Sequence, residues 1–167
     1  LKKITIPNSV KRIENWCFYG CISLETFELP ASITSIGDYA FAQCTMLSAI
    51  IIPSSLTSIG DDAFNGCFSL SRIEIPSSVV SIGKDVFIGC SSLERISIPD
   101  SLTLLNHGLF NCCSNLKEVT IPSSIITIGN NAFSHCISLT EISIPSSVKS
   151  IGLFAFCSCT SLIKINI

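Results

Sequence analysis

Hydrophobic and polar residues follow a short pattern that returns every 23 residues along the chain. In residues 24–29, Phe27 and Leu29 flank Glu28, which is the period-two alternation of a strand with one buried face. Pro30 follows, and it ends the strand because proline has no backbone N–H to give to a ladder. Each 23-residue block therefore predicts one short strand.

The second half of each block has a helix-like spacing. Ala40, Phe41, Cys44 and Leu47 fall at i, i+1, i+4 and i+7, which predicts one or two helical turns. Gly37, ahead of this segment, predicts a turn with positive φ. The residue just before the predicted helical turns is often a good N-cap. These candidate N-caps are Asn15, Asp38, Asp61 and Asn130.

Five residue types recur in fixed columns at this period, without insertion or deletion. The proline column is Pro7, Pro30, Pro53, Pro76, Pro99, Pro122 and Pro145. The phenylalanine column runs from Phe18 to Phe156, the cysteine column from Cys21 to Cys159, the leucine column from Leu24 to Leu162 and the serine column from Ser9 to Ser147. A fixed period of 20–29 residues is typical of a solenoid, in which each repeat is one coil.

The fold class that we predict is an α/β solenoid with strands stacked in parallel about 4.8 Å apart. About eight short strands, near residues 3–6 and every 23 residues onward to 164–167, form a sheet on one face. Short helical turns form the other face. The unbroken period predicts a single domain over residues 1–167 with about seven repeats. The chain begins in mid-repeat and has no polar terminal repeat, so we expect it to be a fragment of a longer protein.

Composition and charge exclude two classes of partner. Mean hydropathy is +0.59, yet no apolar run approaches the roughly 18 residues of a spanning helix, and a run such as residues 49–52 ends at once at Pro53. We therefore expect no membrane insertion in this segment. The net charge of −2 comes from 10 basic and 12 acidic residues without a basic stripe, so we expect no nucleic-acid partner.

The repeat unit L-x-x-I-x-I-P-x-S-V-x-x-I-G-x-x-A-F-x-x-C resembles the BspA-like (Treponema-type) leucine-rich repeat family over essentially the whole chain. Residues 52–64 match this unit nearly perfectly. The resemblance implies a right-handed leucine-rich-repeat superhelix in a cell-surface or secreted protein that adheres to host matrix or cell-surface proteins. One departure is the serine column, which replaces the asparagine ladder of ordinary leucine-rich repeats. A serine hydroxyl can bond to backbone groups of a turn in a similar role.

The ten cysteines do not by themselves indicate disulfides or metal. Seven of them share the repeat with phenylalanine and leucine, where a coil interior is expected, and buried free cysteine packs as a small hydrophobe. Stacked neighbours lie nearly 5 Å apart, whereas a disulfide needs Cβ atoms at about 3.8 Å. A zinc site from Cys112, His135 and Cys157 is imaginable, but it lacks the C-x₂₋₄-C spacing of structural zinc. We predict no metal and no cofactor.

Catalytic chemistry has no support in the sequence. Neither His107 nor His135 has a serine or an acid in a fixed relation that the neighbouring coils lack. Asn106 stands where the other coils carry glycine, and asparagine tolerates the same left-handed conformation. We therefore predict that the chain is not an enzyme.

The outward strand positions vary between coils and are the predicted site. Arg72 and Arg95 form a basic pair beside the acidic pair Glu118 and Glu141. Solenoids use such extended surfaces to hold partner proteins. The predicted partner-binding residues are Glu25, Thr26, Glu28, Ile51, Arg72, Glu74, Arg95, Ser97, Glu118, Thr120 and Glu141.

Two functions remain open at this point. The leading hypothesis is a non-enzymatic protein-interaction or adhesion module that binds a partner through the strand face. The alternative is a structural spacer that holds another domain away from the cell surface. In that case, Arg95 and Glu118 pair across strands and serve only to solubilise the sheet.

Overall fold

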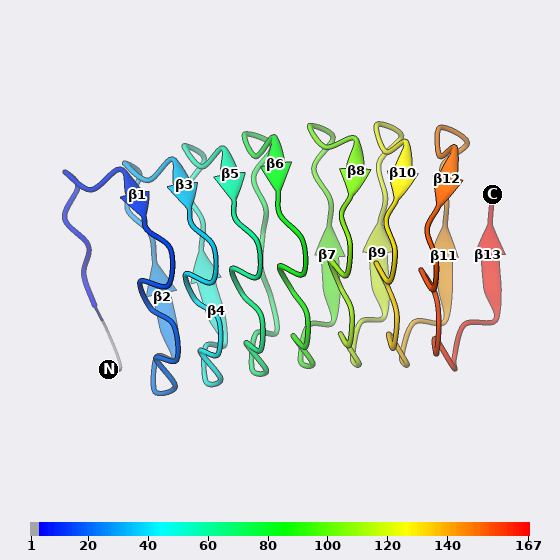
Figure 1. The fold of residues 1–167 in the computed structure, drawn as a ribbon, viewed down its shortest axis with the longest axis horizontal. Coiled ribbons are helices and arrows are strands. Elements are labelled where there is room, and N and C mark those ends of the chain that lie inside the picture. Colours follow the sequence, from blue (N-terminus) through cyan, green and yellow to red (C-terminus); the bar gives the residue numbers. More distant parts are fainter. Residues whose placement is uncertain (1–3) are drawn as a thin grey trace.

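In a computed structural model that describes residues 4–167, the chain forms a solenoid whose coils follow one another along one axis (Figure 1). We number the coils by the phenylalanine column, so that coil 1 contains Phe18, coil 4 contains Phe87 and coil 7 contains Phe156. Coils 2, 3, 5, 6 and 7 each run through a three-residue strand, a two-residue strand and a series of turns, whereas the described residues of coils 1 and 4 have only the two-residue strand and the turns. The predicted solenoid is confirmed.

The three-residue strands lie where the sequence predicts them. They are β2 (Thr26–Glu28), β4 (Ala49–Ile51), β7 (Arg95–Ser97), β9 (Glu118–Thr120), β11 (Glu141–Ser143) and β13 (Lys164–Asn166), the last of which begins an eighth coil. In β2, β4, β7 and β11 the central residue is buried and both neighbours are exposed, as the alternation predicts.

These strands do not form one sheet of about eight strands, so this part of the prediction is wrong. They pair in parallel only as β2 with β4, β7 with β9, and β11 with β13. A single bridge joins Ala49 of coil 3 to Arg72 of coil 4, and residues 4–6 form no strand. Residues 1–3, including Lys3 at the start of the first predicted strand, lie outside the described residues.

A second ladder of parallel strands, which the sequence did not predict, runs beside the first (Figure 1). Its members are β1 (Arg12–Ile13), β3 (Ser35–Ile36), β5 (Ser58–Ile59), β6 (Ser81–Ile82), β8 (Leu104–Leu105), β10 (Thr127–Ile128) and β12 (Ser150–Ile151). We call this the short-strand ladder. Each strand has two residues, which is too short for an alternation to be visible in the sequence.

The predicted helical turns are absent: residues 4–167 contain no helix. Alternate backbone N–H groups instead bond to the next coil and to their own coil. The N–H of Phe41 donates to Ala63 O of the next coil (2.8 Å), that of Ala42 to Tyr39 O (3.1 Å), and that of Gln43 to Asn65 O (2.7 Å). In an α-helix every N–H would bond four residues back within its own segment, and none would remain for the neighbouring coil.

Two columns of residues make these turns possible because they adopt positive φ. The first is Trp16, Tyr39, Asp62, Asp85, Gly108, Asn131 and Phe154, and the second is Gly20, Gln43, Gly66, Gly89, Cys112, His135 and Ser158. Left-handed φ is uncommon outside glycine, asparagine and aspartate, so a chain with Trp16 or Cys112 in these columns gives little sign of it.

The candidate N-caps have a different role from the one predicted. Because no helix follows them, their side chains accept a hydrogen bond from the same column of the next coil. The N–H of Asp61 donates to Asp38 Oδ1 (2.9 Å), and that of Lys84 donates to Asp61 Oδ1 (2.7 Å). Asn15 and Asn130 accept in the same way from Asp38 and Leu153. These side chains therefore link coils instead of starting a helix.

The glycine column is also required for a reason other than the predicted positive φ. Gly60, like Gly37, does not have positive φ. A Cβ on Gly60 would lie 2.6 Å from the backbone nitrogen of Asp38 and 2.7 Å from the carbonyl carbon of Gly37. Glycine is therefore needed at this position because the backbone of the preceding coil approaches it so closely.

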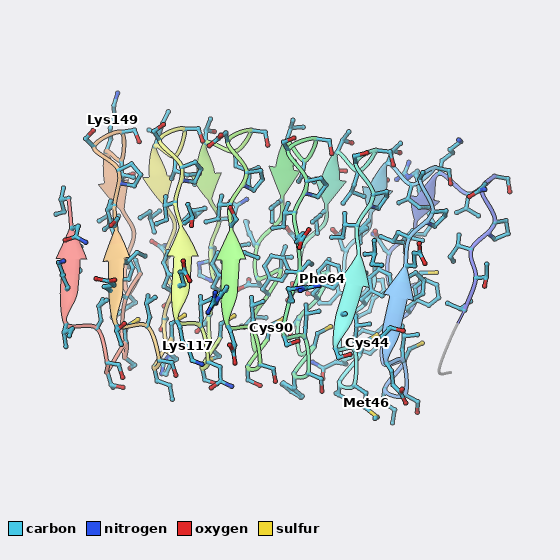
Figure 2. All side chains as sticks on the ribbon, turned by 180° about the vertical axis from the view of Figure 1, so that it is seen from behind. Cys44, Met46, Phe64, Cys90, Lys117 and Lys149 are labelled. Atoms are coloured by element: carbon cyan, nitrogen blue, oxygen red, sulfur yellow. The ribbon has the colours of Figure 1, made fainter. Side chains whose placement is uncertain are left out.

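The core is a stack of phenylalanine rings along the solenoid axis (Phe64 in Figure 2). Consecutive rings of the column have centroids 5.2–5.7 Å apart, and five of them, from Phe41 to Phe133, are fully buried. Stacked aromatic pairs at such separations stabilise a core beyond their area burial. Each coil therefore depends on both neighbours for the burial of its ring.

The cysteine and serine columns connect the coils through the backbone carbonyls. All ten cysteines are free, which confirms the prediction of packed thiols for the column. Cys90 Sγ, for example, donates to Phe64 O (3.4 Å), and burial raises its thiol pKa well above the ordinary value. Burial likewise raises the pKa of Cys44 to about 12. Ser55 Oγ donates to Ile33 O (2.6 Å), which is the backbone-bonding role predicted for the serine column. The same bond is made by Ser32, Ser78, Ser101 and Ser147, but Ser124 Oγ is buried without a partner among the described residues.

We predict that replacing a central ring of the stack is costly. Phe87→Ala should lower the free energy of unfolding by about 3–5 kcal/mol, because it removes a fully buried ring that lies between Phe64 and Phe110. The measurement is urea denaturation followed by circular dichroism. Phe154→Ala is the matched control, since this ring is 66% exposed and its loss should cost under about 0.5 kcal/mol. Equal effects of the two variants would contradict the stack as the core.

Candidate functional site

The predicted partner-binding residues lie together on one side of the solenoid. We call this surface the strand face: the exposed side chains of β2, β4, β7, β9, β11 and β13, of residues 72–74, and of the residue before each of these segments. Exposed side chains at the predicted positions are Glu25, Thr26, Glu28, Ile51, Arg72, Glu74, Arg95, Ser97, Glu118, Thr120 and Glu141. The sequence prediction omitted Glu94 and Lys117, although both are exposed and stand in the same column as Glu25.

Ion pairs connect the strands that also pair through their backbones. Arg95 Nε lies 3.7 Å from Glu118 Oε2, and Lys117 Nζ lies 3.5 Å from Glu94 Oε1, both across the interval between β7 and β9. Lys164 Nζ lies 4.0 Å from Glu141 Oε2 across β11 and β13. These side chains are mostly exposed, so each pair contributes about 0–1 kcal/mol.

Like charges face one another across the two intervals where these charged strands are not paired. Arg72 and Arg95 occupy the same column in coils 4 and 5, and Glu118 and Glu141 occupy it in coils 6 and 7. No backbone ladder connects the three-residue segments across either interval within the described residues. Like charges directly opposite each other destabilise a strand pair, and opposite charges stabilise it. The order of charges in this column therefore matches the pattern of strand pairing.

A groove lies in the strand face at each of these unpaired intervals. The Arg72–Arg95 groove has a volume of about 320 Å³, and Glu74, Ser97 and Glu118 also line it. The Glu118–Glu141 groove has a volume of about 500 Å³, and Thr120 and Ser143 are among its lining residues. Each groove has two like charges of the central column at its unpaired interval and one opposite charge of that column at its border, Glu118 for the first groove and Arg95 for the second.

A second feature of the sequence distinguishes the interval between coils 4 and 5. Here the short-strand ladder is also interrupted, since β6 and β8 do not pair. Asn106 occupies the glycine column at this point, and its Nδ2 donates to Ile82 O (2.6 Å). In the coils before it, the backbone N–H makes this bond, as Gly83 N does to Ile59 O (2.9 Å). The asparagine side chain therefore replaces a close backbone contact, which an interruption of the glycine column could have revealed.

The predicted left-handed conformation of Asn106 is not found, because its φ is not positive. The positive-φ residues of this coil are Gly108 and Cys112 instead. The prediction that Asn106 replaces glycine by adopting a left-handed backbone is therefore wrong. Asn106 instead bonds through its side chain to Ile82 O of coil 4.

Cys112, His135 and Cys157 are exposed at the turn side of the solenoid, away from the strand face. The N–H of His135 donates to Cys157 O (2.7 Å), and His135 Nδ1 lies 2.9 Å from Ser134 Oγ. Among residues 4–167 no three His, Cys, Asp or Glu side chains are grouped in a way that could hold a metal ion. Ser134 itself is buried.

The class of protein that this fold defines is a leucine-rich repeat solenoid. Comparison with known families gives the particular one: the chain matches the BspA type leucine rich repeat region over residues 1–111 and 81–167, with six copies of the repeat. The chain therefore belongs to this family, which is generally non-enzymatic. A search of curated proteins found no match.

Solved structures with similar repeats support the same assignment. A leucine rich repeat protein of T. pallidum is 35% identical with a TM-score of 0.87, over 92% of this chain and 72% of that one. A leucine rich cell surface protein from Faecalibacterium prausnitzii is 34% identical with a TM-score of 0.85, over 93% of this chain and 42% of that one. A leucine-rich repeat protein from Bacteroides ovatus is 32% identical with a TM-score of 0.79, over 100% of this chain and 49% of that one.

The chain thus spans less than half the length of two of these three similar proteins. Residues 4–167 contain no helix that is long and apolar enough to cross a membrane.

We predict that reversing the charge of Arg72 stabilises the fold. Arg72→Glu replaces the like-charge neighbour of Arg95 by an opposite charge and breaks none of the ion pairs found among residues 4–167, so the free energy of unfolding should rise by about 0.2–1 kcal/mol. Urea denaturation measures the change. Arg95→Glu is the matched control: its new contact with Arg72 is offset by the new repulsion from Glu118, so it should bring no gain. A loss of stability in Arg72→Glu would contradict this account of the groove.

Proposed function

We propose that the chain is a non-enzymatic protein-interaction module that binds a partner protein through the strand face. The observation that carries the proposal is the charge order of the central column, in which Arg72 and Arg95, and then Glu118 and Glu141, stand in adjacent coils. Both like-charge contacts oppose strand pairing. A partner that brings counter-charges into the two grooves relieves this repulsion.

The proposal extends to location and to adhesion. One similar protein is described as a leucine rich cell surface protein, which supports placement of this chain at the cell surface or outside the cell. A non-enzymatic family and an extended, exposed strand face support adhesion to a host matrix or cell-surface protein.

The alternative is a structural spacer, and the ion pairs between strands favour it. Arg95 with Glu118 and Glu141 with Lys164 already have partners within the chain, and such pairs solubilise a sheet. A spacer, however, gains nothing from the like-charge contact of Arg72 with Arg95. Stability and binding therefore respond differently to substitutions in the two hypotheses.

The test is adhesion of the purified chain to matrix deposited by cultured epithelial cells. We expect Arg72→Glu/Arg95→Glu to weaken this adhesion at least tenfold, because it reverses the charge of one groove edge. Lys149→Glu is the control, since Lys149 is exposed beside the short-strand ladder and away from Lys117 on the strand face (Figure 2). Unchanged adhesion of the double variant, with its circular dichroism intact, would favour the spacer.

A further inference from the structure

We propose that the partner for which the strand face is built is a second copy of this chain, bound antiparallel about a two-fold axis that passes between β7 and β9. This inference rests on the proposed function, because it uses the same surface. It follows from the order of charges in the strand-face columns. A two-fold interface brings one patch against itself, so that residue i meets j and residue j meets i.

The central column is self-complementary when it is reversed. It reads Arg72, Arg95, Glu118 and Glu141 along one copy, and therefore Glu, Glu, Arg, Arg along an antiparallel copy. An axis along the strand direction keeps each column opposite itself. Arg72 then faces Glu141 of the second copy, and Arg95 faces Glu118 of the second copy. Each side chain that has a like-charged neighbour within its own chain receives an opposite charge from the second copy.

A neighbouring column obeys the same symmetry independently. It reads Ser71, Glu94, Lys117 and Thr140, so reversal places Glu94 opposite Lys117 of the second copy. Glu94 and Lys117 are charged and exposed, whereas Ser71 and Thr140 at the two ends carry no charge. Three distinct ion pairs, each formed twice by the symmetry, thus connect the two copies.

The outer positions of the patch bring no like charges together. Glu74 faces Ser143 of the second copy, and Ser97 faces Thr120 of the second copy. One coil further out, Ala49 faces Lys164 of the second copy. The opposite-charge pairs thus lie in coils 4 to 7, and these outer positions add no repulsion to them.

Other registers of the same arrangement are unfavourable. If the second copy slides by one coil, the two-fold axis passes through Arg95 or Glu118. That residue then faces the same residue, with the same charge, in the second copy. A shift by two coils places Arg72 opposite Arg95, or Glu118 opposite Glu141. Like charges brought together across an interface cost several kcal/mol. The charge order therefore selects one register.

The predicted dimer is weak and depends on salt. Six coils at about 4.8 Å per coil give a contact roughly 29 Å long and only one short strand wide. Such an area is below that of a standard protein interface, and exposed ion pairs are weakened by screening. We expect a transient dimer with a dissociation constant on the order of 100 μM at low salt.

Sedimentation equilibrium of the chain, at loading concentrations up to the high micromolar range and low salt, tests the proposal. Arg72→Glu and Glu141→Arg should each weaken the dimer about tenfold, because each turns two attractive contacts into repulsive ones. The exchange Arg72→Glu/Glu141→Arg should restore the wild-type constant within about threefold, since position 72 then again meets the opposite charge at position 141. Thermal melts check that Glu141→Arg, which loses its ion pair with Lys164, is folded.

The outcomes separate this proposal from the one before it. Dimers that dissociate in 1 M NaCl, weaken in both single variants and recover in the exchange support the antiparallel arrangement. A monomer at every concentration, or an exchange that does not restore the dimer, overturns it. If matrix adhesion still falls in Arg72→Glu/Arg95→Glu while the chain stays monomeric, the strand face binds a different protein, and only the dimer is refuted.

Discussion

The whole fold depends on how the backbone of the turn segment divides its hydrogen bonds. Alternate N–H groups bond within the coil and to the next coil, as Ala42 does to Tyr39 and Phe41 does to Ala63. A helix would use every N–H internally, so neighbouring coils could meet only through side chains. The alternation satisfies the buried backbone and at the same time fixes the spacing between coils, and every ladder of like side chains follows from that spacing.

Once the spacing is fixed, each column of the repeat has one physical task. Glycine at position 60 leaves room for the backbone of the coil before it, and Asp38 caps the N–H of Asp61 across coils. The phenylalanine rings stack along the solenoid axis. The cysteine thiols and the serine hydroxyls donate hydrogen bonds to backbone carbonyls of the preceding coil. Because these tasks repeat in most coils, the outward strand positions are the ones free to vary, and they carry the charge order from Arg72 to Glu141.

The sequence predicts the solenoid, the strand positions and the buried columns because each leaves a periodic trace, such as Phe27 and Leu29 around Glu28. The turns were predicted wrongly as helical, since Ala40, Phe41, Cys44 and Leu47 have the same spacing in a helix and in a run of turns. The two-residue strands are too short to show a pattern. The residues of the candidate site lie on one exposed face, as the alternation predicts, while their binding role stays a prediction. The interruption of strand pairing between coils 4 and 5 coincides with Asn106, whose side-chain bond only the structure shows.

The most direct test of the account is the hydrogen-bond partner of the Phe64 amide. Through-hydrogen-bond scalar coupling in NMR detects which carbonyl carbon accepts from a given N–H. The account predicts coupling from Phe64 N to the carbonyl carbon of Val86, whose oxygen lies 3.0 Å away in the next coil. Coupling from Phe64 N to the carbonyl carbon of Gly60, four residues back as in an α-helix, would contradict it.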